Sequence, residues 1–356
     1  MAVSHRKPAV HSIYRSVKNG VISRWRSLRA PRKSAERTHY AFRLSRRRDY
    51  TRSLSLPGYW RLSGHVWMTL WRHKRVIGLL IALYTVLYAV LVGVMSQDTY
   101  AQLSSTVQAV GSQVVEGNMS GLSQGVALYL TTITNSANSQ LDATKQVYAG
   151  LLGLLLWLTV VWLLRAMLAN KAPRLRDGLY NSGAPILPTF IVTLVLFVQA
   201  FPAAIAAIGY GAASASGLLS GGVETMLFWV VESLLVALSL YWMTSTFIAL
   251  VVVTLPGMYP IKALRAAGEL VLGRRLRVLW RILWLLLLVA IAWTLVVLPM
   301  IFFDGWLKSV LPAIQWLPLV PGTLLLIGSV SLTYSAAYIY ILYRRIVDDD
   351  TRAGQN

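Results

Sequence analysis

Four polar side chains recur at seven-residue intervals within one long apolar run of the sequence: Thr225, Glu232, Ser239 and Thr246. Side chains at this spacing share one face of an α-helix, so the pattern predicts a polar stripe along that helix. Glu232 is the only acid within the apolar runs of the chain. A charge facing lipid at this depth is expensive, so we expect the stripe to face other helices or a wet cavity.

Two interpretations of the polar stripe stay open. In the first, Glu232 is the intramembrane titrating group of a proton- or cation-coupled transport path. In the second, the stripe is a packing seam between helices, and Glu232 is protonated or hydrogen-bonded. The apolar runs contain no histidine and no second acid that would complete a proton relay, and this favours the packing seam.

Other chemistry is sparse in this sequence. The chain has no cysteine, which excludes thiolate metal sites, Fe–S clusters and cysteine nucleophiles. All five histidines precede the first apolar run, and there is no zinc-protease motif, P-loop or dinucleotide fingerprint. We therefore predict a protein that is not an enzyme and that uses no metal and no cofactor.

The composition is typical of an integral membrane protein. Of the 356 residues, 56% are hydrophobic and 13% are charged, whereas soluble domains have about 25% charged residues. A helix needs about twenty apolar residues to cross a hydrocarbon layer about 30 Å thick. The runs that qualify are 76–95, 148–168, 186–208, 226–255, 278–303 and 317–343. Because lipid cannot satisfy backbone polar groups, we predict an all-α membrane protein with six transmembrane helices.

The positions of Lys and Arg predict the orientation. More than half of the 34 Lys and Arg residues precede the first run, and the segments after the second, fourth and sixth runs are also basic. The segments 96–147, 209–225 and 304–316 hold few cations. By the positive-inside rule, both termini are cytoplasmic. We expect a multi-pass protein of the cell membrane or, alternatively, of an organellar inner membrane.

The chain divides into a basic arm (1–57) that we expect to be disordered, a six-span domain (58–345) and a cytoplasmic tail (346–356). The arm fits three roles: holding anionic lipid, which we favour, binding nucleic acid, or directing the chain to an organelle. We expect anionic headgroups to contact Arg46, Arg47, Arg48, Arg72, Lys74, Arg75, Arg274, Arg275 and Arg277.

The extracytoplasmic segment 96–147 is polar but has apolar residues at helical spacing, which predicts a hairpin of two amphipathic helices. A loosely ordered loop is the alternative. Small residues at four-residue spacing predict helix-packing faces elsewhere. They are Ser329, Thr333 and Ala337 in the sixth run, and Ala203 and Ala207 in the third.

Short basic stretches precede the first, third and fifth runs, at 64–75, 174–183 and 260–277. Their amphipathic patterns predict three cytoplasmic elbow helices. Each elbow is followed by two runs, so we expect three units of elbow and hairpin around a pseudo-threefold axis.

Two of these elbow regions carry a resemblance to a known group. They read Leu255-Pro-Gly-Met-Tyr-Pro-Ile-Lys-Ala-Leu-Arg and Arg176-Asp-Gly-Leu-Tyr-Asn-Ser. These stretches resemble the elbows of bacterial multi-pass families grouped with the membrane domain of glycerophosphodiester phosphodiesterases. The resemblance implies a membrane domain that does not itself carry the hydrolase, so no activity follows from it. The basic arm and the polar outer segment depart from that pattern.

The sequence thus predicts a multi-pass envelope membrane protein that organises lipid or partner proteins. Anionic headgroups on the cytoplasmic side are the expected lipid partners, and a protein partner would bind the arm or the outer hairpin. The alternative is a small-solute or lipid transporter that uses Glu232.

Overall fold

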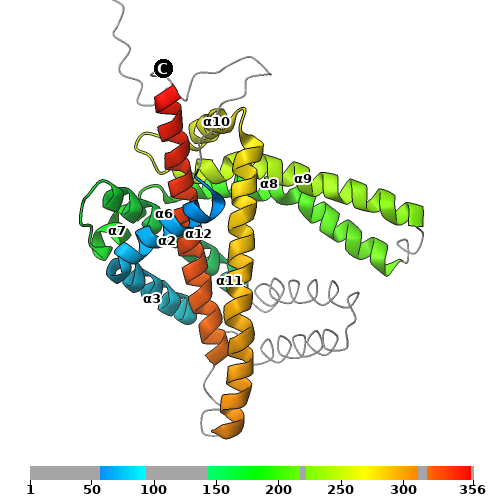
Figure 1. Cartoon of the computed structure of the whole chain (residues 1–356), viewed down its shortest axis with the longest axis horizontal. Coiled ribbons are helices and arrows are strands. Elements are labelled where there is room, and N and C mark those ends of the chain that lie inside the picture. The colour runs from blue at the N-terminus through cyan, green and yellow to red at the C-terminus, as the bar shows by residue number, and fades with distance from the viewer. Residues whose placement is uncertain (1–56, 94–142, 217–221, 312–318, 354–356) are drawn as a thin grey trace, which may run out of the picture.

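The computed structural model describes residues 57–93, 143–216, 222–311 and 319–353, and within these ranges helices are the only regular elements (Figure 1). The helices are α2 (Tyr59–Arg72), α3 (Lys74–Leu91), α6 (Ala143–Leu168), α7 (Leu175–Ser182), α8 (Ile186–Ala215), α9 (Gly222–Val252), α10 (Pro260–Val271), α11 (Arg275–Val310) and α12 (Leu319–Ala353). The basic arm and the predicted outer hairpin lie outside the described residues.

Six of these helices, namely α3, α6, α8, α9, α11 and α12, are long and apolar enough to cross a membrane. Each coincides with one of the six predicted runs. The longest, α11, has 36 residues and extends past its run at both ends, whereas α12 has 35 residues and extends past its run at the C-terminal end. The chain is therefore a multi-pass α-helical membrane protein.

Three shorter helices, α2, α7 and α10, directly precede α3, α8 and α11. The contact between α7 and α6 is close enough to require a glycine. A Cβ atom added at Gly178 would lie 2.9 Å from Leu163, which is too short for any side chain. Gly257 (φ 73°) turns the chain between α9 and α10, and Gly273 (φ 77°) turns it between α10 and α11.

The core forms around α12, which packs against α2, α3, α6, α9 and α11. Its side chains Tyr338, Ile339 and Leu342 are almost entirely buried. The predicted packing face of α12 is confirmed, because its small residues Ser329, Thr333 and Ala337 are all buried. Small side chains allow neighbouring helices to approach closely, and this accounts for the central position of α12.

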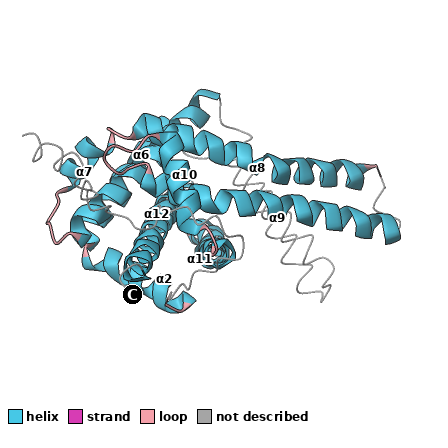
Figure 2. Ribbon diagram, turned by 90° about the horizontal axis from the view of Figure 1, so that it is seen from above, coloured by secondary structure: helices cyan, strands magenta, loops and turns pink. Residues whose placement is uncertain are grey.

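The hairpin of α8 and α9 is arranged differently. Its two helices run side by side and reach away from the other spans (Figures 1 and 2). The prediction of a packing face at Ala203 and Ala207 is wrong, because Ala207 is exposed and Ala206 is the buried residue. This part of α8 is rich in alanine, so spacing alone could not select the packed face. The pseudo-threefold arrangement of the three pairs of spans stays a prediction.

Candidate functional site

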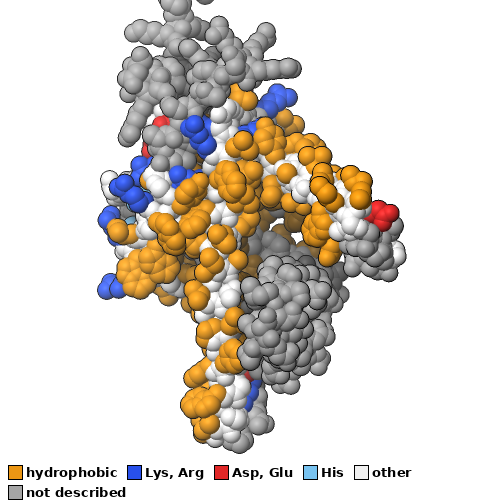
Figure 3. Space-filling view, turned by 45° about the vertical axis from the view of Figure 1, so that its right-hand side comes forward, with side chains coloured by type: hydrophobic (Ala, Val, Ile, Leu, Met, Phe, Trp, Pro, Cys, Tyr) orange, Lys and Arg blue, Asp and Glu red, His pale blue; other side chains and the backbone are white. Residues whose placement is uncertain are grey.

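Lys and Arg side chains gather toward one end of the molecule, which carries α10 and the C-terminal end of α12 (Figure 3). We call this the basic end. The helix α2 reaches it, because His65 lines a small crevice there together with Arg344, Arg345 and Asp348 of α12. The crevice has a volume of about 190 Å³. Burial, followed by the nearby charges of Arg345 and Arg72, lowers the pKa of His65 below 6.5.

Three of the predicted lipid contacts lie together where α2 meets α3. Arg72, Lys74 and Arg75 are all exposed, and we call them the cationic strip. None of the three has a carboxylate partner among the described residues. Trp67 and Trp71 stack beside the strip with ring centroids 5.9 Å apart, and the ammonium of Lys74 lies 5.4 Å from the Trp71 ring. Exposed indoles beside cations are typical of a membrane interface.

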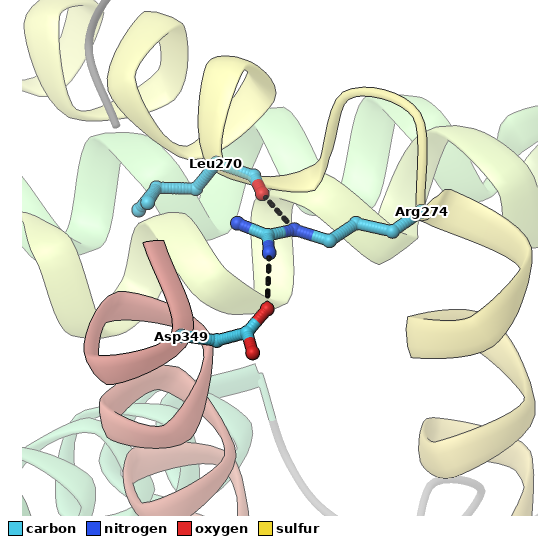
Figure 4. Close-up of polar contacts among 3 residues, drawn as sticks. All are labelled: Leu270, Arg274 and Asp349. Atoms are coloured by element: carbon cyan, nitrogen blue, oxygen red, sulfur yellow. Dashed lines mark hydrogen bonds and ion pairs between the residues drawn. The ribbon is translucent and has the colours of Figure 1, made fainter. Parts of the chain in front are cut away.

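The side chain of Arg274 makes its contacts inside the protein (Figure 4). It is fully buried, and its Nε donates to the Leu270 carbonyl oxygen over 2.8 Å. Its Nη1 lies 3.4 Å from a carboxylate oxygen of Asp349. Arg274 therefore joins the corner between α10 and α11 to the end of α12. A lipid headgroup would have to displace these contacts to reach it.

The neighbouring cations of α11 take two positions. Arg277 is exposed, as a headgroup contact requires. Arg275 is half-buried, and its guanidinium carbon lies 4.9 Å from the centre of the Tyr241 ring on α9. The predicted contacts Arg46, Arg47 and Arg48 lie outside the described residues.

Arg281 was not among the predicted sites, although it lies inside an apolar run. Its side chain is 8% exposed, and its guanidinium carbon lies 4.3 Å from the centre of the Tyr59 ring. Its Nη1 is buried and has no hydrogen-bond partner among the described residues. The signal in the sequence was an arginine in the first turn of the apolar run 278–303.

A larger crevice lies where α6 ends and α7 begins. It has a volume of about 580 Å³, and its polar lining includes Arg165, Lys171 and Asp177. The guanidinium of Arg165 donates to the Oγ1 and the carbonyl oxygen of Thr254, over 2.6 and 3.2 Å. Asp177 accepts the backbone N–H of Arg174 over 3.1 Å and so caps α7. Lys171 is exposed, so it is the cation of this crevice that a ligand from solution could meet first.

Part of the predicted polar stripe joins α9 to α8. The hydroxyl of Ser239 donates to the backbone carbonyl of Gln199, and the hydroxyl of Thr246 donates to the Gln199 side-chain oxygen over 2.6 Å. Sequence reasoning missed Gln199, because helical spacing within one run does not identify the partner on another.

The N-terminal part of the stripe holds Thr225 and Glu232. Thr225 and Glu232 are half-buried, and one carboxylate oxygen of Glu232 is buried without a hydrogen-bond partner among the described residues. Ser239 and Thr246 of the stripe therefore contact α8, and both interpretations of Glu232 stay predictions.

The described residues contain no group of three or more His, Asp or Glu side chains that could hold a metal ion. Comparison with protein-family models, with curated proteins and with solved structures finds no match for this chain.

Proposed function

We propose that this multi-pass membrane protein organises anionic lipid at its basic end, that this end faces the cytoplasm, and that the protein catalyses no reaction. The cationic strip carries the proposal. Arg72, Lys74 and Arg75 are exposed next to Trp67 and Trp71, and no carboxylate of the described chain neutralises them. A strip of this kind attracts anionic headgroups by about 1 kcal/mol per basic residue near the surface.

Several acids of the described chain already have structural roles, which supports the absence of catalysis. Asp177 caps α7, Asp304 pairs with Lys308 over 2.8 Å, and Asp349 pairs with Arg274. General acid–base catalysis would need carboxyl groups that converge on a substrate, as paired acids do in hydrolases.

The test is the lipid that remains bound to the protein. We would extract the full chain from nanodiscs of mixed phosphatidylglycerol and phosphatidylcholine and measure the ratio of the two bound lipids by mass spectrometry. Wild type should be enriched in phosphatidylglycerol, and changing Arg72, Lys74 and Arg75 together to Gln should remove most of that enrichment. Lys145→Gln is the control, because Lys145 lies beside Gly93 at the far end of α3.

Unchanged enrichment in the triple variant would contradict the proposal. Recovery of a stoichiometric protein partner from native membranes, with no lipid preference in the nanodiscs, would contradict it as well. That result would support instead a scaffold for partner proteins that bind the arm or the outer hairpin.

A second candidate function is proton- or cation-coupled transport through Glu232. The observation in its favour is the buried carboxylate oxygen of Glu232 that lacks a hydrogen-bond partner. Purified protein in liposomes containing a trapped pH-sensitive dye should then conduct protons, and Glu232→Gln should abolish the signal. Glu224→Gln is the matched control, because Glu224 is exposed in the first turn of the same helix. Equal proton flux in wild type and Glu232→Gln would exclude this function.

A further inference from the structure

An apolar groove lies between α2, α11 and α12, and none of the three residues of the cationic strip lines it. It has a volume of about 550 Å³. Trp60, Gly64 and Trp67 of α2 form one wall, and they share one face of that helix because they are four and three residues apart. Gly64 leaves a notch between the two indoles, since a Cβ atom added there would meet nothing within 4 Å.

The remaining walls come from two spans. Leu288, Val289, Ala292 and Val296 of α11 face residues of α12 that run from Thr323 to Tyr334. At 1.5 Å per residue, the α12 wall is about 16 Å long. One leaflet of a hydrocarbon layer about 30 Å thick has nearly the same depth. The groove therefore matches a lipid chain in length.

The hydroxyl groups of the groove wall are bonded to other protein groups. Ser63 donates to the Tyr59 carbonyl oxygen over 3.0 Å and accepts from the Trp284 indole over 3.0 Å. Tyr334 donates to the backbone carbonyl of Ser63 over 3.3 Å, and the Trp293 indole donates to Ser331 over 2.9 Å. A groove whose hydroxyl groups are already bonded offers water few partners, so it favours an apolar occupant.

Positive charge lies at the α2 end of the groove. Arg61 follows Trp60 in the sequence and is exposed. Arg281 is buried beneath the Tyr59 ring, and no carboxylate of the described chain lies within 4.0 Å of its guanidinium. Tyr59 and Trp60 both contact Trp284, with ring centroids 5.7 and 5.0 Å apart, so these aromatic rings connect the buried cation to the groove wall. A buried charge without a counterion attracts an anion strongly, because the low dielectric screens it little.

We propose that this groove holds one acyl chain of an anionic glycerophospholipid, with the phosphate at the α2 end beside Arg61 and above Arg281. The lipid chain extends past Trp60 and Trp67 and lies between α11 and α12. This site goes beyond the proposed function, because it is a single-lipid site with a defined chain path and does not include the cationic strip.

The test uses the full chain in nanodiscs that contain phosphatidylglycerol with a diazirine in one acyl chain. Light should attach the lipid to α11 and α12 peptides that include the groove wall. Gly64→Leu fills the notch without a backbone clash, and Ala292→Phe fills the groove from the opposite side. Each variant should lower this labelling about tenfold, because a lipid chain binds about tenfold more weakly when two of its CH₂ groups lose contact with the groove.

The matched control is Gly78→Leu. Gly78 is an exposed helical glycine on α3 that also has open space around its Cβ position, but it does not line the groove. Its labelling should equal that of wild type. Equal labelling in all four proteins, or labels spread evenly over the exposed faces of α8 and α9, would overturn the proposal. Cross-links from the groove to a second protein chain would overturn it too.

The headgroup preference is tested with a second probe that has the same diazirine acyl chain but a phosphatidylcholine headgroup. Arg61→Gln and Arg281→Met should each remove most of the preference for phosphatidylglycerol at the groove, whereas Lys262→Met, an exposed cation on α10, should leave it unchanged. An unchanged preference in both Arg variants would overturn the assignment of an anionic lipid. The triple variant of the cationic strip should retain groove labelling, so failure of the proposed function and failure of this site give different results.

Discussion

The central span α12 of the bundle and the span α8 of the hairpin are both apolar enough to cross a membrane, yet they bury very different shares of their surface. In the most apolar window of α12, 61% of residues are buried inside the protein, compared with 11% in α8. The exposed side chains of the hairpin include Phe197 and Trp229. Hydropathy thus identifies both as spans, but it does not distinguish surface that packs against protein from surface that faces lipid.

The bundle and the hairpin are both joined by packing and by hydrogen bonds between helices. Around α12, Ala336, Ala337 and Tyr338 are entirely buried, Tyr334 donates to the Ser63 carbonyl oxygen of α2, and the Trp293 indole of α11 donates to Ser331. Between α8 and α9, Ser239 and Thr246 donate hydrogen bonds to Gln199. Lipid tails are as apolar as leucine, so helices in a membrane associate through close packing and hydrogen bonds rather than through the hydrophobic effect. The bundle therefore adds extensive packing to its polar contacts, whereas the hairpin joins its two helices through the shared partner Gln199.

The largest expected effect is a difference in the free energy of unfolding between two variants, one with a substitution in the bundle and one with a substitution in the hairpin. Leu342→Ala in α12 removes a fully buried side chain and should lower the free energy of unfolding by about 2–5 kcal/mol. Leu234→Ala in α9 removes a side chain that is 69% exposed and should change it by about 0.5 kcal/mol or less. Denaturant unfolding in mixed micelles measures both. Equal losses would mean that the hairpin is as tightly packed as the bundle.

The sequence predicts the spans well because each crossing leaves a local record of about twenty apolar residues. The packing face of α12 was also predictable, because Ser329, Thr333 and Ala337 are three small residues in succession at four-residue spacing. The alanine-rich part of α8 offers several registers, so its packed face was not. Contacts between distant helices, such as Gln199 with Thr246, leave no such record in a single sequence.

The candidate sites were likewise predictable only where local sequence determines whether a side chain is exposed. Exposure of Arg72, Lys74 and Arg75 follows from their place between an amphipathic helix and a span. Burial of Arg274 does not follow from the sequence, because Arg277 lies only three residues away in the same basic stretch and is exposed. The difference arises because the turn at Gly273 brings Arg274 close to Asp349, which is distant in sequence.

Breaking the ion pair between Arg274 and Asp349 should have the next largest effect on the free energy of unfolding. This pair lies in the bundle and not in the hairpin. Arg274→Met leaves the Asp349 carboxylate, which is 15% exposed, without this partner. We expect a loss of about 3 kcal/mol in the free energy of unfolding, as found when one member of a buried pair is removed. Arg277→Met, which changes an exposed cation, should have little effect in the same measurement.

A double-mutant cycle with Asp349→Asn separates the pair from its surroundings. The double variant should lose less than the sum of the two single variants. Strict additivity would show that Arg274 stabilises the corner through its bond to the Leu270 carbonyl rather than through the carboxylate.

A smaller effect tests the polar contact in the hairpin. Thr246→Val removes the hydroxyl that donates to Gln199, whereas Thr244→Val removes one that donates within its own helix to the Leu240 carbonyl. Both threonines are buried, so the two variants are matched. Thr246→Val should destabilise the hairpin by about 0.6 kcal/mol more, the average for hydrogen bonds between membrane helices. Hydrogen exchange of α8 amides measures this difference. Equal exchange in both variants would show that the bond from Thr246 to Gln199 does not stabilise the hairpin.

The smallest expected effect is a change in stability with pH. It should be confined to the bundle, because every histidine of the chain precedes the first span. Burial of His65, and the charges of Arg345 and Arg72, lower its pKa below 6.5, and Arg344 and Asp348 also line its crevice. Below pH 6.5 the unfolded chain then binds the proton more readily than the folded chain. The contribution of His65 to stability is therefore complete above pH 6.5 and decreases as the pH falls through that value.

Amide exchange at the C-terminal end of α12 should accordingly rise slightly on acidification, while α8 and α9 stay unchanged. His65→Asn should remove the response, since an amide does not titrate in this range. A response of equal size in the hairpin, or one that persists in His65→Asn, would assign the pH dependence to other groups. In that case the carboxyl group of Glu232 would be the one to substitute next, because one of its oxygens is buried in the hairpin without a hydrogen-bond partner among the described residues.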